Sequence, residues 1–483
     1  QIMIFSSFEF IFLFLPLTFC LYFYLNKKKL TTLATGSLAF ASLFFYSWWN
    51  IIYLPLILFS VIINYTFSLL MTKLTLYKKT LLIFGLLFNV LLLGYFKYSD
   101  FFLQNINFVF DTNYSLLRLT LPLAVSFFTF QQIAFLVDSF KGYVVKHTFL
   151  NYIVFVTFFP QLIAGPIVHH KEMMPQFVKK RNKFINYKNI YLGVFIFTIG
   201  LFKKVVIADT FSIWASNGFD VLELLSLIEA WITSLSYTFQ LYFDFSGYTD
   251  MAIGVALLFN IKLPLNFNSP YKATNIRDFW QRWHITLSRF LRDYVYIPIG
   301  GNKKGSFKMY TNLLATFLIG GMWHGAGWTF IFWGALHASA IIFHRIWCNT
   351  GVNLNKLVAW FLTFNFINIS WIFFRAEQWE DAIKVLKGMF GFSGVVLPSI
   401  FFNISFLQGN EIVIGEVFAN FNSDTEITLW LLIALFICLF FKNSNEIVSF
   451  YKPDNKVVFF IVSIFTISLM NLDKNVDFIY FNF

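Results

Sequence analysis

The chain has 483 residues, of which 58% are hydrophobic, 22% aromatic and only 12% charged, against about 25% charged in a soluble domain. With a mean hydropathy of +0.67, this composition leaves too little polar surface for water-facing domains, and it is also the reverse of a disordered chain. The net charge of +12 does not indicate nucleic-acid binding, because no basic stretch belongs to a soluble module. The composition places the chain in a lipid bilayer.

Apolar runs long enough to cross a bilayer as a helix, about 17 to 25 residues, recur along the chain. They fall near residues 4–25, 31–50, 52–71, 80–96, 115–137, 189–207, 224–243, 326–346 and 357–375. Shorter runs that can also span lie near 310–323, 428–441 and 457–471. We therefore expect an all-α polytopic membrane protein with about 10 to 12 transmembrane helices.

One apolar stretch differs from the others. Residues 155–168 carry two prolines and a glycine. Such a sequence favours a broken or re-entrant segment, which is tolerated at membrane depth only when it is buried in protein or lines a cavity.

The distribution of Lys and Arg orients this map. Basic clusters occupy 27–29, 73–79, 141–146, 171–188 and 262–308, whereas 98–117, 205–261 and 388–441 contain no Lys or Arg. Cytoplasmic loops of membrane proteins are enriched in these residues, so the clusters are predicted to be cytoplasmic. On this map the amino terminus lies outside, and the carboxyl terminus does too if the last two short runs both cross.

A dense polar block extends from residue 236 to residue 337. Ionisable groups near membrane depth are costly and usually face a cavity or a partner. Asp244 and Asp250 fit either a cavity wall or a structural ion pair. Four arginines between 277 and 293 alternate with aromatic residues, which predicts a largely amphipathic helix at the cytoplasmic surface. These arginines can bind anionic lipid, bind the phosphates of a nucleotide-containing donor, or simply set the topology.

Histidine is scarce, with seven in the chain. His324 lies between Trp323 and Gly325, and His284 lies inside the polar block. A desolvated imidazole stays neutral and can accept a proton, and small neighbours let a substrate approach it, although a satisfied core histidine is the simpler alternative. We expect the remaining histidines, apart from His337 in an apolar run, to be solvated or interfacial: His147, His169, His170 and His344.

Metal binding has no support in the sequence. The three cysteines show no paired spacing, and no HExxH motif is present. The patterns of serine hydrolases and P-loop ATPases are also absent.

Several longer segments carry a resemblance to a known family. They are SFFTFQQIAFLVDSFKG (126–142), FFPQLIAGPI (158–167), DFSGYTDMAIG (244–254), NIRDFWQRWHITLSRFLRDYVYIPIGGN (275–302), MWHGAGWTFIFWG (322–334), SWIFFRAE (370–377) and FIYFNF (478–483). Together they resemble the membrane-bound O-acyltransferases, and within that family the bacterial branch that O-acetylates cell-envelope polysaccharides. The likeness covers essentially the whole chain in the expected order.

The resemblance implies a fold and a set of site residues. The fold is a single integral-membrane domain over 1–483, with N-terminal helices (1–114), a catalytic core (115–375) and C-terminal helices with an aromatic tail (376–483). Membrane, re-entrant and interfacial helices would surround a central funnel that ends at a buried histidine. The residues implied for catalysis are His324, His284 and Tyr480, and those implied for donor binding are Asn275, Arg282 and Trp283. Tyr480 would carry the acyl group transiently, or else serve as an interfacial aromatic anchor.

The implied activity is acetyl transfer across a bacterial inner membrane. Cytoplasmic acetyl-CoA would be the donor, and a periplasmic SGNH or esterase-like partner would pass the acetyl group to peptidoglycan or to an exopolysaccharide such as alginate. Membrane lipids are also expected as partners, whereas neither a metal nor nucleic acid is expected. Three alternatives stay open: D-alanyl transfer to teichoic acid, a secondary transporter, and a membrane scaffold for a periplasmic enzyme.

Overall fold

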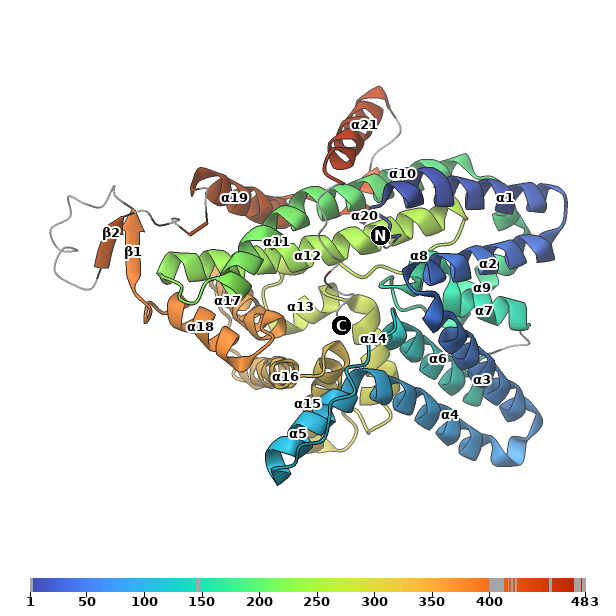
Figure 1. Cartoon of the computed structure of the whole chain (residues 1–483), viewed down its shortest axis with the longest axis horizontal. Helices are drawn as coiled ribbons and strands as arrows, with labels where there is room; N and C mark the ends of the chain where they lie inside the picture. The colour runs from blue at the N-terminus through green and yellow to red at the C-terminus, as the bar shows by residue number, and fades with distance from the viewer. Residues whose placement is uncertain are drawn as a thin grey trace.

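The computed structural model describes residues 3–144, 148–398, 412–415, 417, 420–421, 424–450, 454–472 and 479. Within these residues the protein is nearly all helical, as the sequence predicts (Figure 1). Two short strands, β1 (Val395–Pro398) and β2 (Ile412–Gly415), pair in parallel with Val395 opposite Ile412.

The N-terminal helices form one side of the molecule. α1 packs on α2, α2 packs on α7, and α3, α4 and α6 pack on one another. The elements are η1 (Glu9–Phe14), α1 (Leu15–Lys27), α2 (Thr31–Trp49), η2 (Ile51–Tyr53), α3 (Leu54–Lys73), η3 (Thr75–Tyr77), α4 (Lys78–Leu93), η4 (Gly94–Tyr98), α5 (Ser99–Phe110), α6 (Val125–Phe140), α7 (Phe149–Thr157), α8 (Phe159–Leu162), α9 (His170–Val178) and η5 (Lys180–Lys183).

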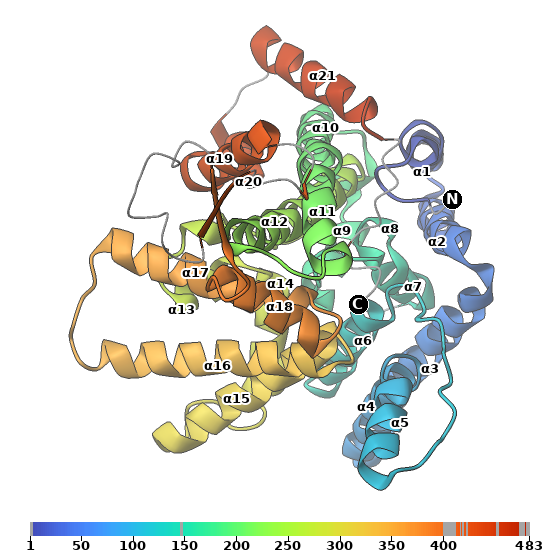
Figure 2. The same ribbon diagram turned by 60° about the vertical axis from the view of Figure 1, so that its left-hand side comes forward.

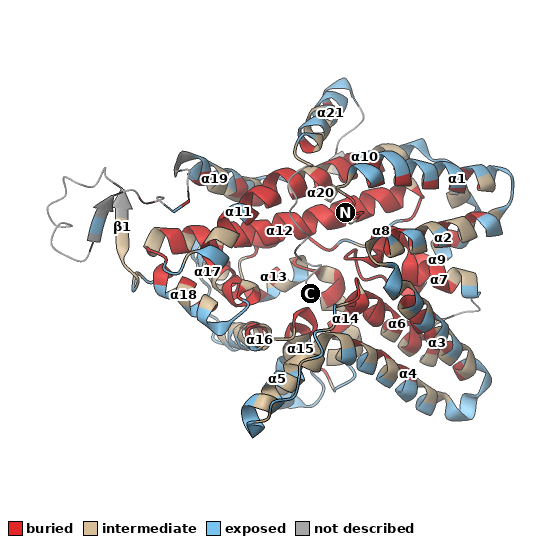
Figure 3. Cartoon of the chain, viewed as in Figure 1, coloured by how far each residue is buried: buried red, intermediate tan, exposed pale blue. Residues whose placement is uncertain are grey.

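The central elements surround a long buried helix, α12. They are α10 (Tyr187–Phe202), η6 (Lys203–Ala208), α11 (Asp209–Ser216), η7 (Asn217–Val221), α12 (Leu227–Leu258), η8 (Pro270–Lys272), α13 (Ile276–Arg282), α14 (Ile285–Leu291), η9 (Arg292–Tyr296), α15 (Gly305–His324), α16 (Trp328–Cys348) and α17 (Lys356–Arg375). A capping box of Ser226 and Glu229 starts α12, which is 32 residues long and buried along nearly its whole length (Figure 3). The short helices α13 and α14 lie between α12 and the α15–α16 pair (Figures 1 and 2).

The C-terminal elements pack on this centre. They are α18 (Trp379–Met389), α19 (Asp424–Phe440), α20 (Ser444–Phe450) and α21 (Asn455–Leu469). α18 contacts α12 and α17, and α21 contacts α10. The tail also reaches the core, because the backbone N–H of Ile479 donates to the Asp244 carboxylate at 3.0 Å.

By length and composition, six helical segments of the described chain can cross a membrane. They are Glu9–Lys27, Ile51–Lys73, Thr75–Phe110, Tyr187–Val221, Trp328–Cys348 and Lys356–Arg375. α6, α19 and α21 are apolar but shorter. The expected total of about 10 to 12 crossings therefore stays a prediction.

The predicted span at 115–137 is wrong in its first part. Residues 112–122 are not helical, and α6 begins only at Val125. Two causes are visible: Pro122 disfavours helix at the residue before it, and the Asp100 carboxylate accepts the backbone N–H groups of Leu117 (2.7 Å) and Arg118 (2.9 Å).

The break predicted at 155–168 is confirmed. α7 ends at Thr157, the single-turn α8 follows, and every residue of the stretch is buried. Burial in protein is the condition under which broken helix is tolerated at membrane depth.

The single amphipathic helix expected at 277–293 is also wrong. The chain breaks between α13 and α14, where His284 adopts a left-handed backbone conformation with φ of +41°. Trp283, Leu287 and Phe290 are buried inside the protein rather than in a headgroup layer. A hydrophobic pattern alone does not reveal such a break, because the pattern continues through it.

Candidate active site

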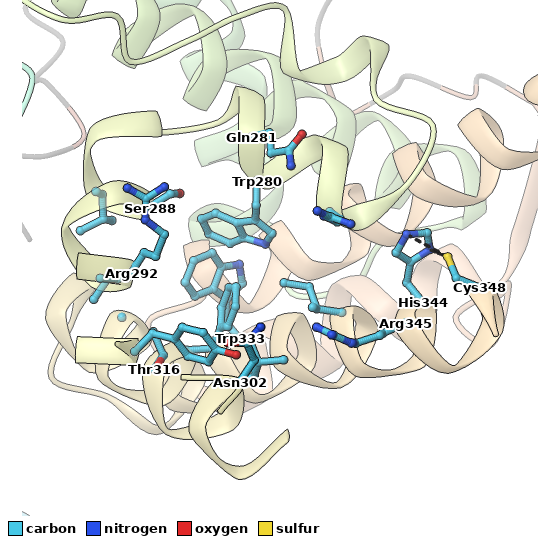
Figure 4. Close-up of a pocket in the computed structure, with 18 of the residues that line it drawn as sticks. Trp280, Gln281, Ser288, Arg292, Asn302, Thr316, Trp333, His344, Arg345 and Cys348 are labelled. Atoms are coloured by element: carbon cyan, nitrogen blue, oxygen red, sulfur yellow. Dashed lines mark hydrogen bonds between the residues drawn. The ribbon is translucent and has the colours of Figure 1, made fainter. Parts of the chain in front are cut away.

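A cavity of about 640 Å³ lies among α13 to α16 (Figure 4). Trp280 and Trp333 stand in the middle of its wall, with Arg292 to one side and Arg345 to the other in the close-up. The full lining is Arg277, Trp280, Gln281, Leu287, Ser288, Leu291, Arg292, Tyr296, Asn302, Leu313, Thr316, Phe317, Gly320, His324, Trp333, Ile341, His344, Arg345, Cys348 and Asn349. Its volume falls in the range of small-molecule sites, about 300–1,000 Å³.

Three exposed arginines give this cavity a positive charge. Arg292 pairs with Asp293 at 2.7 Å, whereas Arg277 and Arg345 have no acidic partner among the described residues. Guanidinium groups bind phosphate and carboxylate groups in a fork geometry. An uncompensated positive lining therefore suits an anionic ligand.

His324 lies at the boundary between the cavity and the buried interior. It is the last residue of α15, lines the cavity and is only 3% exposed. Three aromatic rings enclose it, with centroids 4.9 Å (Trp323), 5.2 Å (Trp333) and 5.0 Å (Phe374) from its own. Such surroundings exclude water from an imidazole that a substrate in the cavity can reach.

The structure brings the second predicted histidine to the first. The His284 and His324 rings lie 6.5 Å apart between centroids, and His284 is fully buried but does not line the cavity. Neither ring nitrogen of His284 has a hydrogen-bond partner among the described residues, although buried polar atoms are nearly always paired. Its left-handed backbone is also uncommon for a residue other than glycine. Strain and missing partners together mark His284 as a functional candidate.

Lys97 is a site residue that sequence reasoning missed. Its partly buried ammonium group reaches the end of α15 and donates to the carbonyl oxygens of Trp323 (2.5 Å) and His324 (3.0 Å) and to Ser126 Oγ (3.3 Å). All three N–H groups are thus engaged, and they secure the turn that carries His324. The available signal was a lysine inside an apolar run, because charges within membrane segments are rarely without purpose.

His337, on the facing helix α16, has a structural role. Trp280 Nε1 donates to His337 Nδ1 at 3.2 Å, and His337 Nε2 lies 3.1 Å from Ser370 Oγ. Both ring nitrogens are therefore engaged within the protein.

Two histidines expected to be solvated or interfacial are buried instead. His169 is 5% exposed and its Nδ1 lies 3.0 Å from the Tyr294 hydroxyl, while His170 packs against Phe135 and Phe155. Burial lowers the pKa of His169 below its ordinary value of 6.5, and Arg289 lowers that pKa further. The break between α7 and α8 turns the following segment back into the protein. The basic residues near these two histidines suggest a solvated loop, so the sequence does not reveal their burial. His344 lines the cavity, and His147 lies outside the described residues.

Asp244 and Asp250, the two aspartates of the polar block, form structural ion pairs and are not part of a cavity wall. Asp250 lies 2.6 Å from Lys203, and Asp244 lies 3.0 Å from Lys204, which also pairs with Asp209 at 2.6 Å. All these groups lie outside the cavity lining.

The three residues implied for donor binding lie elsewhere than the cavity wall. Asn275 caps α13 by accepting from the Asp278 N–H, and Arg282 Nε lies 2.7 Å from the carboxylate of that same aspartate. Trp283 is 1% exposed and packs against Phe279 and Trp371. The neighbouring Arg277, with Arg292 and Arg345, takes the positions that face the cavity.

Tyr480, the third residue implied for catalysis, lies outside the described residues. Its neighbour Ile479 is held by Asp244, and the next residue of α12, Phe245, contacts the His284 ring at 4.8 Å between centroids.

Metal ligands do not gather in the part of the chain that the structure describes: no three His, Cys, Asp or Glu side chains are grouped to hold an ion. The three cysteines are free thiols. Cys348 lies at the cavity with its Sγ 3.7 Å from His344 Nε2.

Comparison with known proteins identifies the family. Residues 139–374 match MBOAT, the membrane-bound O-acyltransferase family. The chain is 54% identical over 429 residues to the peptidoglycan O-acetyltransferase of Helicobacter pylori, covering 82% of this chain and 81% of that protein. The chain belongs to the membrane-bound O-acyltransferase family.

Other relatives place this acyltransferase within the family. It is 38% identical over 399 residues to the probable alginate O-acetylase AlgI of Pseudomonas aeruginosa, covering 81% of this chain and 75% of that protein. The teichoic acid D-alanyltransferase of Bacillus subtilis is 30% identical over 227 residues, which is 45% of this chain and 57% of that protein. The predicted family, fold and enzyme class are thereby confirmed: the protein is a multi-pass membrane O-acyltransferase rather than a secondary transporter.

Proposed function

We propose that this acyltransferase takes an acetyl group from cytoplasmic acetyl-CoA and passes it across a bacterial inner membrane for the O-acetylation of peptidoglycan. The observation that carries the proposal is the position of His324, a buried imidazole at a cavity lined by three arginines. Similarity over most of both chains to a peptidoglycan O-acetyltransferase supports the choice of polymer.

Charge supports an anionic donor from the cytoplasm. Arg277 and Arg292 belong to the basic region 262–308, which the positive-inside tendency assigns to that side. Positive potential in a cleft concentrates anionic ligands, so the phosphates of acetyl-CoA suit the mouth of the cavity while its thioester extends toward His324. On the same map both termini lie in the periplasm.

His324 acts as the general base in this proposal. It takes the proton of an acceptor hydroxyl while that oxygen attacks the thioester carbonyl, and it returns the proton to the thiolate as the C–S bond breaks. His284 lies outside the lining of the donor cavity. We therefore assign it to the side from which the acceptor approaches, where it stabilises the charge that develops during transfer. Lys97 keeps the His324 backbone in place.

The acetyl group then leaves toward the periplasm. We assign Tyr480 as a candidate carrier and an SGNH or esterase-like protein as the partner that modifies the polymer. An exopolysaccharide such as alginate is the second polymer, favoured by the similarity to alginate O-acetylases, and D-alanyl transfer is the second reaction.

Inverted inner-membrane vesicles that contain this protein, with the proposed partner and peptidoglycan enclosed in the lumen, test the donor and the direction of transfer. Acetyl-CoA labelled with ¹⁴C in the acetyl group is added outside, where the cytoplasmic face is exposed, and the peptidoglycan is then digested with muramidase. Alkali-labile label on the fragments supports the proposal. Label that comes only from activated D-alanine, or the accumulation of intact acetyl-CoA in the vesicles, would contradict it.

The arginine-lined mouth gives a sharper test of the donor. Arg345→Gln is expected to raise the KM for acetyl-CoA about tenfold, since one charge-assisted contact is lost, with kcat nearly unchanged. Acetyl-pantetheine, which lacks the nucleotide, should show no such change. Lys308→Gln, an exposed cation of the same basic region outside the cavity lining, is the matched control. An equal loss with both donors would argue against phosphate binding at Arg345.

A further inference from the structure

Trp333 is a cavity residue to which the steps above give no role. It is 1% exposed, yet its indole Nε1–H has no hydrogen-bond acceptor among the described residues. Buried donors are nearly always paired, and an unpaired one costs about 1–3 kcal/mol. Trp333 lines the cavity, so a ligand bound there can supply the acceptor that the protein does not.

Its neighbours hold the indole rigidly. The ring centroid lies 5.0 Å from that of Phe374 and 4.8 Å from that of His337, and the indole stacks on Trp371 at 5.8 Å. A donor fixed in this way needs no reorganisation when charge develops next to it, which is the property that makes such groups catalytically effective.

The same packing sets the indole beside the base. α15 and α16 touch at Gly321 and Gly334: a Cβ on Gly321 would lie 2.3 Å from the Phe330 carbonyl oxygen, and one on Gly334 would lie 2.4 Å from that of Phe317. Only glycine allows this approach of the two backbones. His324 follows the first glycine by one helical turn and Trp333 precedes the second, and their rings meet edge to face at 5.2 Å between centroids.

Other indoles at the site are not equivalent. Trp280 also lines the cavity, but its N–H is already donated to His337, and the Trp323 N–H is donated to the Ser126 carbonyl at 3.3 Å. Trp333 combines a cavity position, contact with His324 and an uncommitted N–H.

We propose that the Trp333 indole N–H binds the carbonyl oxygen of the thioester donor and stabilises the oxyanion formed during acyl transfer; this inference rests on the proposed function. As the acceptor oxygen bonds to the carbonyl carbon, the C=O π pair moves onto the carbonyl oxygen and the hydroxyl proton moves to His324. The pair then returns, the C–S bond breaks, and the departing thiolate takes the proton from His324. Trp333 donates one hydrogen bond throughout and loses no proton.

The kinetic test replaces Trp333 by phenylalanine and, to keep the shape of the indole, by benzothienylalanine, in which sulfur replaces the N–H. Each change is expected to lower kcat about 100-fold, the usual cost of one oxyanion donor, while the KM for acetyl-CoA changes less than about threefold. The benzothienyl side chain removes the hydrogen bond alone, so the result does not depend on whether the smaller phenylalanine packs well.

A spectroscopic test detects the hydrogen bond itself. Acetyl-CoA labelled with ¹³C at the carbonyl is bound to the His324→Ala protein, which cannot turn over, and the isotope-edited infrared band is recorded. The carbonyl band should lie at lower frequency in His324→Ala than in His324→Ala with Trp333→Phe. Trp280→Phe in the same background is the control, and the band should stay in place because that N–H is committed to His337.

The outcomes separate the two hypotheses. An unshifted band together with an unchanged kcat in both Trp333 variants would overturn the role of Trp333 and leave the proposed function intact. If no acetyl-CoA binds and the wild type transfers no label from it, the proposed function fails, and this inference fails with it.

Discussion

Two groups of buried polar side chains in this protein differ in how they are paired. Around η6 and α12, Lys203 and Lys204 meet Asp209, Asp244 and Asp250 at 2.6 to 3.0 Å. Around the cavity, the ring nitrogens of His284, the N–H of Trp333 and the hydroxyl of Ser288 lack partners among the described residues. Both groups are costly to bury. The paired group recovers that cost within the fold and the unpaired group does not, so the first is expected to govern stability and the second activity.

The largest effect is expected from breaking the paired group. Lys204→Met leaves Asp209 and Asp244 buried without their cation, and removing one partner of a buried pair costs about 3–5 kcal/mol of unfolding free energy. Denaturation of the protein in detergent measures the loss. Lys384→Met is the matched control, since among the described residues that lysine donates to the Phe219 and Leu222 carbonyls and forms no ion pair, and its loss should cost less than half as much. Equal costs for the two variants would contradict the comparison.

The unpaired group should respond in the opposite way. His284→Asn keeps a side chain that tolerates the left-handed backbone but removes the imidazole, and kcat should fall about 100-fold. Stability should be unchanged or slightly higher, because two unpaired nitrogens leave the interior. Steady-state acetyl transfer and the denaturation midpoint are measured on the same preparation. A large loss of stability with normal kcat would assign His284 to the core.

Lys97 sharpens the comparison because it is paired but serves the site. Lys97→Met is expected to lower kcat about 10- to 100-fold by loosening the turn that carries His324. Steady-state acetyl transfer is measured together with the denaturation midpoint. An unchanged kcat with a lowered midpoint would leave Lys97 with a structural role alone.

The smallest effect concerns stability against pH at His169. Burial holds its pKa below the ordinary 6.5, so below that pH the unfolded chain binds a proton that the folded protein resists. Stability is therefore complete above about pH 6.5 and declines as the pH falls through and below it. His169→Gln should flatten the fall of the denaturation midpoint between pH 7.5 and 5.5. If the midpoint of His169→Gln falls with pH as steeply as that of the wild type, another group is responsible for the pH dependence.

Much of this site was predictable from sequence, and the misses have physical causes. Motifs made His324 and His284 candidates, because the sequence motifs around them are long and specific, and the structure places the two rings 6.5 Å apart between centroids. The break at His284 could not be foreseen, since the apolar pattern runs through it. Asn275, Arg282 and Trp283, which the resemblance implies for donor binding, lie outside the cavity lining. Arg345 joins the cavity from α16, a contact that only tertiary structure reveals.

The role of Trp333 was hidden in a similar way. A tryptophan in an apolar helix is normally interpreted as a core residue. Whether its N–H has an acceptor depends on neighbours distant in sequence. Long apolar helices such as α16 and α17 were predicted nearly to their ends, because length and composition decide them locally. The start of α6 was missed because Asp100, far from it in sequence, engages the chain before Val125.

A single-turnover assay of His324→Ala tests the central claim most directly. Labelled acetyl-CoA is supplied to the cytoplasmic face of wild-type and variant vesicles, with protein amount and denaturation midpoint matched, and ester-linked acetyl is counted over time. Loss of the general base should slow transfer about 10³-fold or more while acetyl-CoA still binds. Transfer at the wild-type rate would contradict the account and leave the protein as a scaffold for chemistry performed elsewhere.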